Sequence, residues 1–153
     1  MDILHILSKA HSGWRWIVLL LLVAAIVKMH MGWKGKKSFT TGDKKLALFA
    51  MIAFHIQFLF GWILYFLSDF LSGKVQFGEG WMKNEVFRFY GMEHVLMMTI
   101  AMILITMGYS KSKKKDTDVA KYKVVAVFYT IAFVLILASI PWPFRAALGG
   151  SWM

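Results

Sequence analysis

Three histidines are the residues of this chain whose type and setting best fit a chemical role. His11, His55 and His94 each lie in or beside a long apolar stretch. An ionisable side chain is costly inside the hydrocarbon of a membrane, so one found there indicates a functional site. Imidazole is the commonest protein ligand for metal ions, and it also binds haem iron. Histidines on three such stretches therefore predict a cofactor held between helices.

Helical spacing places each histidine beside residues that suit a flat, charged cofactor. His11 and Arg15 are four residues apart and share one helix face. His55 lies on an aromatic stripe, and Gly61 in a following turn leaves room for a flat group to approach the backbone. His94 aligns with a tyrosine and two methionines on its own helix. Facing side chains of this kind build the cofactor sites of helical bundles.

Charged residues near the histidines suggest how such a cofactor would be held. Arg15, Arg88 and Arg145 are expected at one membrane face, where guanidinium groups can pair with the propionates of haem. Glu93 can accept the second N–H of a ligand histidine and so fix the orientation of its ring.

The depth of each histidine follows from the helical rise of ~1.5 Å per residue. Measured from the lysine-rich ends of the segments, His11 and His94 lie at about 25 and 24 Å, and His55 at about 15 Å. His11 and His94 are therefore nearly level, and they belong to the first and third segments. His11 with His94 is the geometrically simpler pair of axial ligands, and His55 with His94 is the competing pair, in which His55 has the more haem-like surroundings. A metal site formed by all three histidines would require His55 to lie at the same depth as His11 and His94.

The elements that carry these residues are four apolar segments. The chain has 153 residues, is 59% hydrophobic and has a mean hydropathy of +0.60. A helix needs roughly 20 mostly apolar residues to cross a bilayer. The segments are 16–27 (extended back toward residue 5), 46–67, 86–107 and 124–140 (extended to 144). The sequence therefore predicts an all-α polytopic membrane protein, a single domain over residues 1–153 that forms an up-and-down bundle of four transmembrane helices.

Charge sets the expected orientation of the bundle. The net charge is +10, and lysines cluster in the first and third connections, within residues 28–45 and 111–123. Short loops rich in Lys and Arg stay cytoplasmic, so both termini should lie outside a bacterial cytoplasmic (inner) membrane. Topology and attraction to anionic membrane lipid explain this charge, and we expect no nucleic-acid partner. The first segment lacks a small-residue cleavage site, so we expect it to be retained rather than removed as a signal peptide.

Turn and capping residues mark the expected helix ends. Asp43 fits the N-cap of the second helix, and residues 116–118 offer a cap for the fourth. Pro141 and Pro143 are expected to end the fourth helix. The chain has no cysteine, which excludes disulfides, thiolate metal sites and covalent attachment of c-type haem. Any haem must therefore be held without a covalent bond.

Four motifs together carry a resemblance to a known group of proteins. They are His11-Ser12-x-x-Arg15-Trp16, His55-x-Gln57-x-x-x-Gly61-x-x-x-Tyr65-Phe66, Glu93-His94-x-x-Met97-Met98 and Pro141-Trp142-Pro143-x-Arg145. Across nearly its whole length the chain resembles small four-helix bacterial proteins of the Bacteroidetes labelled cytochrome b or cytochrome b-like, and it is loosely similar to cytochrome b561. The resemblance implies non-covalent haem b at His11, His55 or His94. Cytochrome b561 usually has four ligand histidines, so the three here do not fit two haems.

These features lead to one main expectation and two alternatives. The main one is a membrane electron-transfer protein with one haem b, which exchanges electrons with a quinone or a redox partner protein. Each histidine can instead make only a hydrogen bond to a neighbouring helix, worth about 1 kcal/mol. The chain would then be a cofactor-free structural or accessory subunit of a larger membrane complex. A transporter or proton path is the weaker alternative, because the sequence has no inverted repeat.

Overall fold

The computed structural model describes residues 3–70 and 77–148, and within them the structure is helical. The long helices are α1 (Ile3–Lys34), α2 (Thr41–Leu64), α4 (His94–Ser112) and α5 (Asp118–Ser139). Shorter elements are η1 (Tyr65–Phe70), η2 (Trp81–Lys83), α3 (Glu85–Arg88), η3 (Phe89–Glu93) and η4 (Ala146–Leu148). The helical stretches Ile3–Lys34, Thr41–Leu67, Glu85–Ser112 and Asp118–Ser139 are each long and apolar enough to cross a membrane. The predicted all-α bundle of a multi-pass membrane protein is confirmed.

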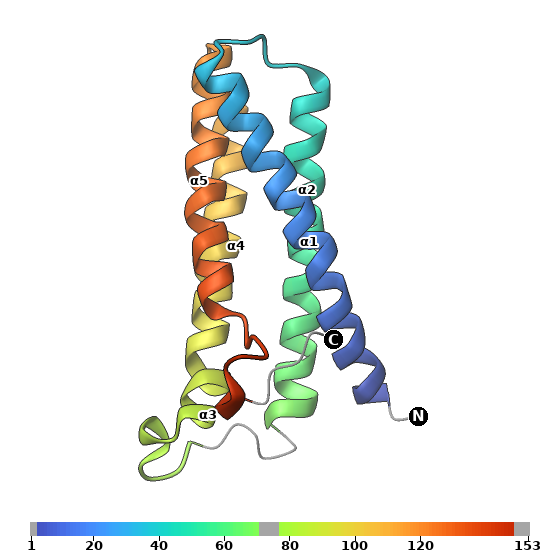
Figure 1. Ribbon diagram of the computed structural model, residues 1–153, viewed down its shortest axis with the longest axis vertical. Helices are drawn as coiled ribbons and strands as arrows, with labels where there is room; N and C mark the ends of the chain where they lie inside the picture. The colour runs from blue at the N-terminus through green and yellow to red at the C-terminus, as the bar shows by residue number, and fades with distance from the viewer. Residues whose placement is uncertain (1–2, 71–76, 149–153) are drawn as a thin grey trace.

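The four long helices form a ring in which each packs mainly against two neighbours. The principal contacts join α1 to α2, α2 to α4, α4 to α5 and α5 to α1. Helices α1 and α4 are therefore diagonal partners, as the up-and-down connection of the chain requires. Figure 1 shows α4 and α5 running side by side along the length of the bundle, while α1 crosses it at an angle.

The two ends of the bundle differ. We call the end that holds the connections 35–40 and 113–117 the lysine-rich end, at the top of Figure 1. The first described residue, Ile3, and the last, Leu148, both lie toward the opposite end. The fourth helix begins at Asp118 and ends at Ser139, before the two prolines that were expected to end it. The predicted extension of the fourth segment to residue 144 is wrong, because residues 141–144 do not continue the helix.

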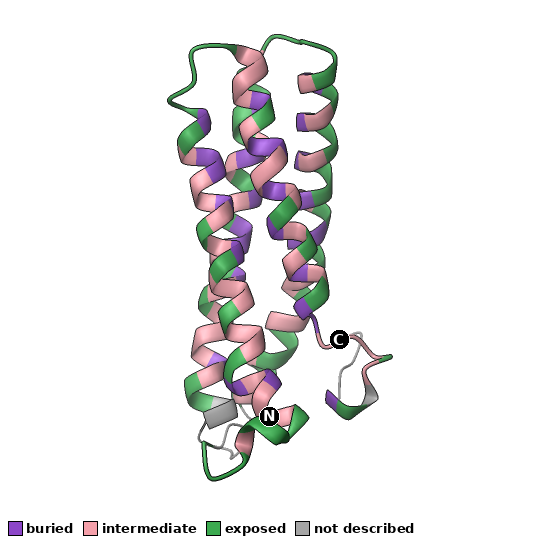
Figure 2. Cartoon of the chain, turned by 90° about the vertical axis from the view of Figure 1, so that its left-hand side faces the viewer, coloured by how far each residue is buried: buried purple, intermediate pink, exposed green. Residues whose placement is uncertain are grey.

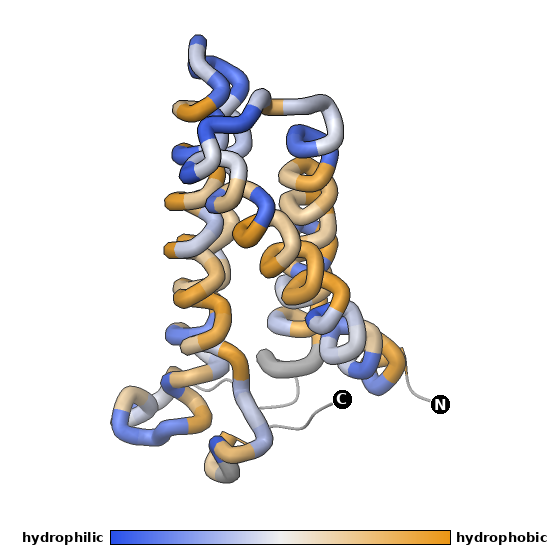
Figure 3. Tube along the Cα trace, turned by 45° about the horizontal axis from the view of Figure 1, so that its top comes forward, coloured by the Kyte–Doolittle hydropathy of each residue, from blue (hydrophilic) through white to orange (hydrophobic). Residues whose placement is uncertain are grey.

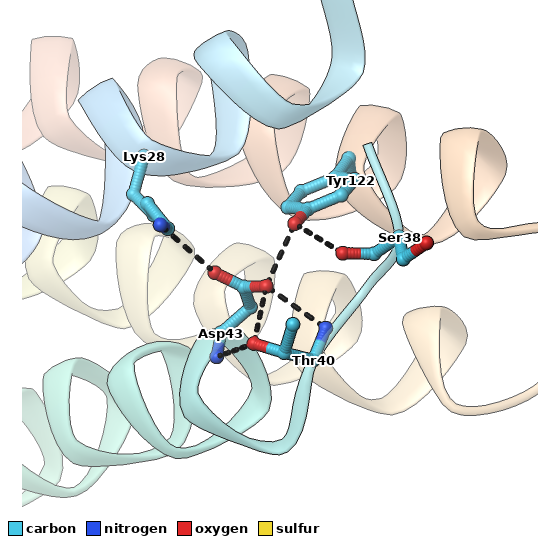
Figure 4. Close-up of polar contacts among 5 residues, drawn as sticks. All are labelled: Lys28, Ser38, Thr40, Asp43 and Tyr122. Atoms are coloured by element: carbon cyan, nitrogen blue, oxygen red, sulfur yellow. Dashed lines mark hydrogen bonds and ion pairs between the residues drawn. The ribbon is translucent and has the colours of Figure 1, made fainter. Parts of the chain in front are cut away.

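Hydrogen bonds and an ion pair at the lysine-rich end join three helices (Figure 4). Asp43, only 2% exposed, accepts bonds from the backbone N–H and hydroxyl of Thr40 at 2.9 and 2.7 Å. The hydroxyl of Tyr122 on α5 lies 2.7 Å from the same carboxylate and 3.0 Å from the carbonyl oxygen of Ser38. The ammonium of Lys28 on α1 lies 3.7 Å from Asp43. This cluster fixes the ends of α1, α2 and α5 together.

Asp43 does not cap α2 as the sequence predicted. The N-cap is Thr40, whose hydroxyl accepts the N–H of Asp43 at 3.2 Å, while Asp43 bonds back to Thr40. This reciprocal arrangement is a capping box, and it leaves the carboxylate free to reach Tyr122 as well. Thr117 caps α5 and lies within the predicted range.

The two halves of the bundle are packed to different extents. Most of the fully buried side chains lie toward the lysine-rich end, as the buried segments in Figure 2 show. They include Leu22 and Met29 on α1, Ala47 and Ala50 on α2, and Val125, Ala126 and Tyr129 on α5. Small residues permit this closeness, because a Cβ at Gly32 would stand 2.3 Å from the ring of Tyr122.

The outward faces of the helices are apolar. Leu20, Leu59 and Val134 are 71%, 59% and 59% exposed. Figure 3 shows apolar residues along the middle of the long helices and hydrophilic ones toward the connections. In water such a surface would favour association or aggregation. In a bilayer it is the expected lipid-facing surface.

Candidate functional site

A cavity of about 220 Å³ lies between the helices in the half of the bundle away from the lysine-rich end. His11 on α1 and His94 on α4 both line this cavity, so the two diagonal helices each contribute an imidazole. Gln57, Gly61 and Tyr65 also line it. The remaining lining residues are mostly apolar and include Val18, Leu19, Phe54, Phe58, Leu64, Val95, Met98, Ile136 and Ile140.

The cavity lies at the level where α5 ends. Helices α1 and α2 continue beyond that level, as Figure 1 shows. Part of the cavity wall is formed by the last turn of α5, through Ile136, and by the residues that follow the helix, Ile140 and Pro141. Pro141 has no N–H, and a proline disfavours the helical conformation in the residue before it. Ile140 is extended accordingly, with φ −78° and ψ 134°.

The end of α5 fixes the ring of His94. A helix leaves its last carbonyl groups without intrahelical partners. The Nδ1–H of His94 donates to the carbonyl oxygen of Ser139 at 2.7 Å. Trp142 donates through Nε1 to the carbonyl of Leu137 at 2.8 Å, and Arg145 reaches that of Ala138 at 3.5 Å. Because a carbonyl only accepts, the proton of a neutral His94 ring is on Nδ1, and its Nε2 keeps a lone pair.

His11 is held differently. The side-chain amide nitrogen of Gln57 donates to the backbone carbonyl of His11 at 2.9 Å and lies 3.3 Å from its Nε2. The Nδ1 atom of His11 is buried and has no hydrogen-bond partner in the described part of the chain. The same holds for the Oε1 atom of Gln57. Buried polar atoms without partners are uncommon and each calls for an explanation, such as a bound group.

Gly61 makes room for a flat group, and in this structure that group is the imidazole of His11. A Cβ added at Gly61 would lie 3.2 Å from Cε1 and 3.9 Å from Nδ1 of His11. The sequence predicted space at Gly61 but connected it with His55 on the same helix. The structure connects it with His11 on the neighbouring helix.

The structure does not bring His55 into this cavity. Its Nδ1 lies 2.7 Å from the carbonyl oxygen of Met51, and its Nε2 lies 3.2 Å from the hydroxyl of Thr106. Both ring nitrogens are therefore engaged between α2 and α4. In the described residues, no three His, Cys, Asp or Glu side chains lie close enough to share a metal ion. A site formed by all three histidines is therefore not supported.

One of the four charged residues predicted for the site lines the cavity, and the other three do not. Arg15 lines the cavity, and its guanidinium lies over the rings of Trp16 and Trp142 at 5.4 and 6.0 Å. Arg88 and Glu93 do not line it, because they pair with each other at 2.6 Å. The predicted bond from Glu93 to a ligand histidine is therefore absent, and the carbonyl of Ser139 takes that role. Arg145 lies over the ring of Phe89, 4.8 Å from its centre.

Two irregular turns that border the cavity were not predicted from the sequence. Residues Tyr65–Phe70 and Phe89–Glu93 adopt π-helical turns, and the second directly precedes His94. The hydroxyl of Tyr65 donates to the carbonyl of Gly91 at 3.2 Å and so joins the two turns. Such turns occur frequently at functional sites. Gln57 was also missed, although an amide in the middle of an apolar segment is a signal in itself.

The described residues at this cavity comprise two imidazoles on diagonal helices, mostly apolar walls, one arginine and buried polar atoms that lack partners. Comparison with known proteins identifies no relative: no family model, no curated protein and no solved structure matches this chain.

Proposed function

We propose that this protein is a membrane electron-transfer protein that binds one non-covalent haem b between α1 and α4, where His11 and His94 would hold the iron. The observation that carries the proposal is that these two histidines line one cavity, whereas both nitrogens of His55 are engaged elsewhere. Haem iron, when bound, supplies one-electron chemistry. The protein would position the group between mostly apolar walls.

His94 is the better prepared of the two ligands. Its Nδ1–H is held by the carbonyl of Ser139, which fixes the tautomer and leaves Nε2 for the iron. Arg15, on the wall of the same cavity, is suited to pair with a propionate.

The setting of the site suggests where electrons enter and leave. By the distribution of lysines, the lysine-rich end faces the cytoplasm of a bacterium and the cavity half lies toward the outer side of its inner membrane. A quinone in the bilayer or a redox protein at the outer surface is then the partner within shortest reach.

Absorption spectroscopy of the purified protein tests the proposal. We expect a b-type spectrum on reduction, and one haem per chain by pyridine haemochrome analysis. His94→Ala should abolish haem binding and His11→Ala should weaken it, while His55→Ala should retain full haem content as the matched control. Full haem content in His94→Ala, or loss in His55→Ala alone, would overturn the ligand assignment.

A colourless protein would reject the haem proposal altogether. If it then co-purified with partner subunits in fixed ratio, the alternative of a cofactor-free structural or accessory subunit would be favoured.

A further inference from the structure

The two histidines differ in which ring nitrogen already has a hydrogen-bond partner. In His94 the Nδ1–H is bonded to the carbonyl of Ser139, and in the described residues Nε2 has no hydrogen-bond partner. His94 therefore offers a lone pair. His11 is the opposite case, because its Nε2 is the nitrogen that already has a neighbour, Gln57.

The orientation of the Gln57 amide follows from the bond to the backbone. The carbonyl of His11 can only accept, so the atom 2.9 Å away must be the NH₂ nitrogen of Gln57 and not its oxygen. That nitrogen also lies 3.3 Å from Nε2 of His11, which must then be an acceptor. A neutral His11 ring consequently carries its proton on Nδ1, the buried atom without a partner.

Within the described residues, the side chain of Gln57 makes hydrogen bonds to His11 alone. Its side chain is 9% exposed, both of its described hydrogen bonds go to His11, and its Oε1 is unpartnered. A buried amide in a membrane helix is costly unless its groups are used. Its position is therefore best explained by what it does to His11.

We propose that Gln57 is a positioning residue that occupies Nε2 of His11, so that the site has one committed ligand, His94, and one replaceable ligand, His11. This inference rests on the haem proposal. Iron must compete with the Gln57 amide for Nε2 of His11 but has no such competitor at His94. The His11 side of the haem is therefore open to a small exogenous ligand such as carbon monoxide.

The first test needs no haem. In haem-free protein labelled with ¹⁵N-histidine, nitrogen chemical shifts report which ring nitrogen carries the proton. His11, assigned by loss of its signal in His11→Ala, should be protonated on Nδ1 with Nε2 as an acceptor. In Gln57→Leu and Gln57→Met this preference should be lost, while the signals of His55 stay unchanged. A wild-type His11 protonated on Nε2 would overturn the proposal.

The second test uses carbon monoxide and the reduced, haem-loaded protein. Removal of the amide frees His11 to bind iron, so carbon monoxide should bind more weakly in both Gln57 variants than in the wild type. The expected decrease is about 2- to 10-fold, the factor that corresponds to one neutral hydrogen bond. His55→Ala should bind carbon monoxide as the wild type does. Unchanged or stronger binding in both Gln57 variants would contradict the inference.

The two proposals fail separately. If the purified protein binds no haem, the proposed function fails, and the nitrogen shifts still decide whether Gln57 sets the tautomer of His11. If haem binds but the wild-type tautomer is the other one, only the role of Gln57 is lost. Gln57→Met keeps the length of the side chain, so a packing defect in Gln57→Leu alone does not decide the result.

Discussion

The Nδ1–H of His94 donates to the carbonyl oxygen of Ser139 at 2.7 Å and so joins the first half of the third membrane span to the end of the fourth. This carbonyl is available only because α5 stops at Ser139. The end of one helix therefore determines which nitrogen of His94 faces the cavity. Changes at the end of α5 should therefore alter the orientation of the His94 ring.

Replacement of both prolines after α5 tests this connection. In Pro141→Ala/Pro143→Ala the backbone regains two N–H groups, and α5 can continue far enough to engage the carbonyl of Ser139. His94 would lose its partner, and the haem affinity should fall by about tenfold or more, as for other residues that orient a ligand. Haem titration measures the change, with Phe144→Ala, at a side chain 76% exposed, as the control. An unchanged affinity with an extended helix would contradict the connection.

Gly61→Leu should disturb the site through His11. Already a Cβ would lie 3.2 Å from Cε1 of the ring, so a larger side chain must displace the imidazole. We expect haem to be bound through His94 alone, visible as a high-spin absorption spectrum. Gly13→Leu on α1 is the matched control, because a Cβ there meets nothing within 4 Å. The prediction is wrong if both variants keep the wild-type spectrum.

The cluster around Asp43 should dominate the polar contribution to stability at the lysine-rich end. Tyr122→Phe removes the hydroxyl that bonds to Asp43 and to Ser38, at a cost of about 1–3 kcal/mol. Lys28→Met should cost about 0–1 kcal/mol, because its side chain is 53% exposed and lies 3.7 Å from the carboxylate. Unfolding in mixed micelles measures both. A larger loss for Lys28→Met than for Tyr122→Phe would reverse the expected order.

Gly32→Ala should destabilise the same end by overpacking. The new methyl group would stand 2.3 Å from ring atoms of Tyr122, which is fully buried and cannot move away freely. Overpacking of this kind costs about 1–3 kcal/mol. Thermal unfolding in detergent should show a lower midpoint than for Gly13→Ala, which has open space around it. Equal midpoints would show that Tyr122 accommodates the methyl group.

Much of the fold could be predicted from the sequence because membrane spans depend on composition. Apolar length gave four helices, and the helical rise placed His11 and His94 at one level. The N-cap of α2 was harder to predict. Thr40 and Asp43 are both residue types that suit an N-cap, and only the reciprocal bonds of the capping box show that Thr40 takes this position.

The details of the site were harder to predict because they depend on backbone atoms and on neighbouring helices. A carbonyl such as that of Ser139 has no signature in the sequence, so Glu93 was the natural partner to expect for His94. Glu93 pairs with Arg88 instead, which lies on the preceding turn. The sequence indicated open space beside Gly61, but which ring occupies that space depends on how α1 crosses α2.

The unequal packing of the two halves has a consequence for how the protein matures. Regions with few buried contacts open at lower free energy than tightly packed ones. The half with the cavity can therefore separate transiently while the other half, closed around Tyr122 and Met29, stays assembled. Under the haem proposal, the prosthetic group would then enter after insertion of the chain into the bilayer, as a late step that needs no global unfolding.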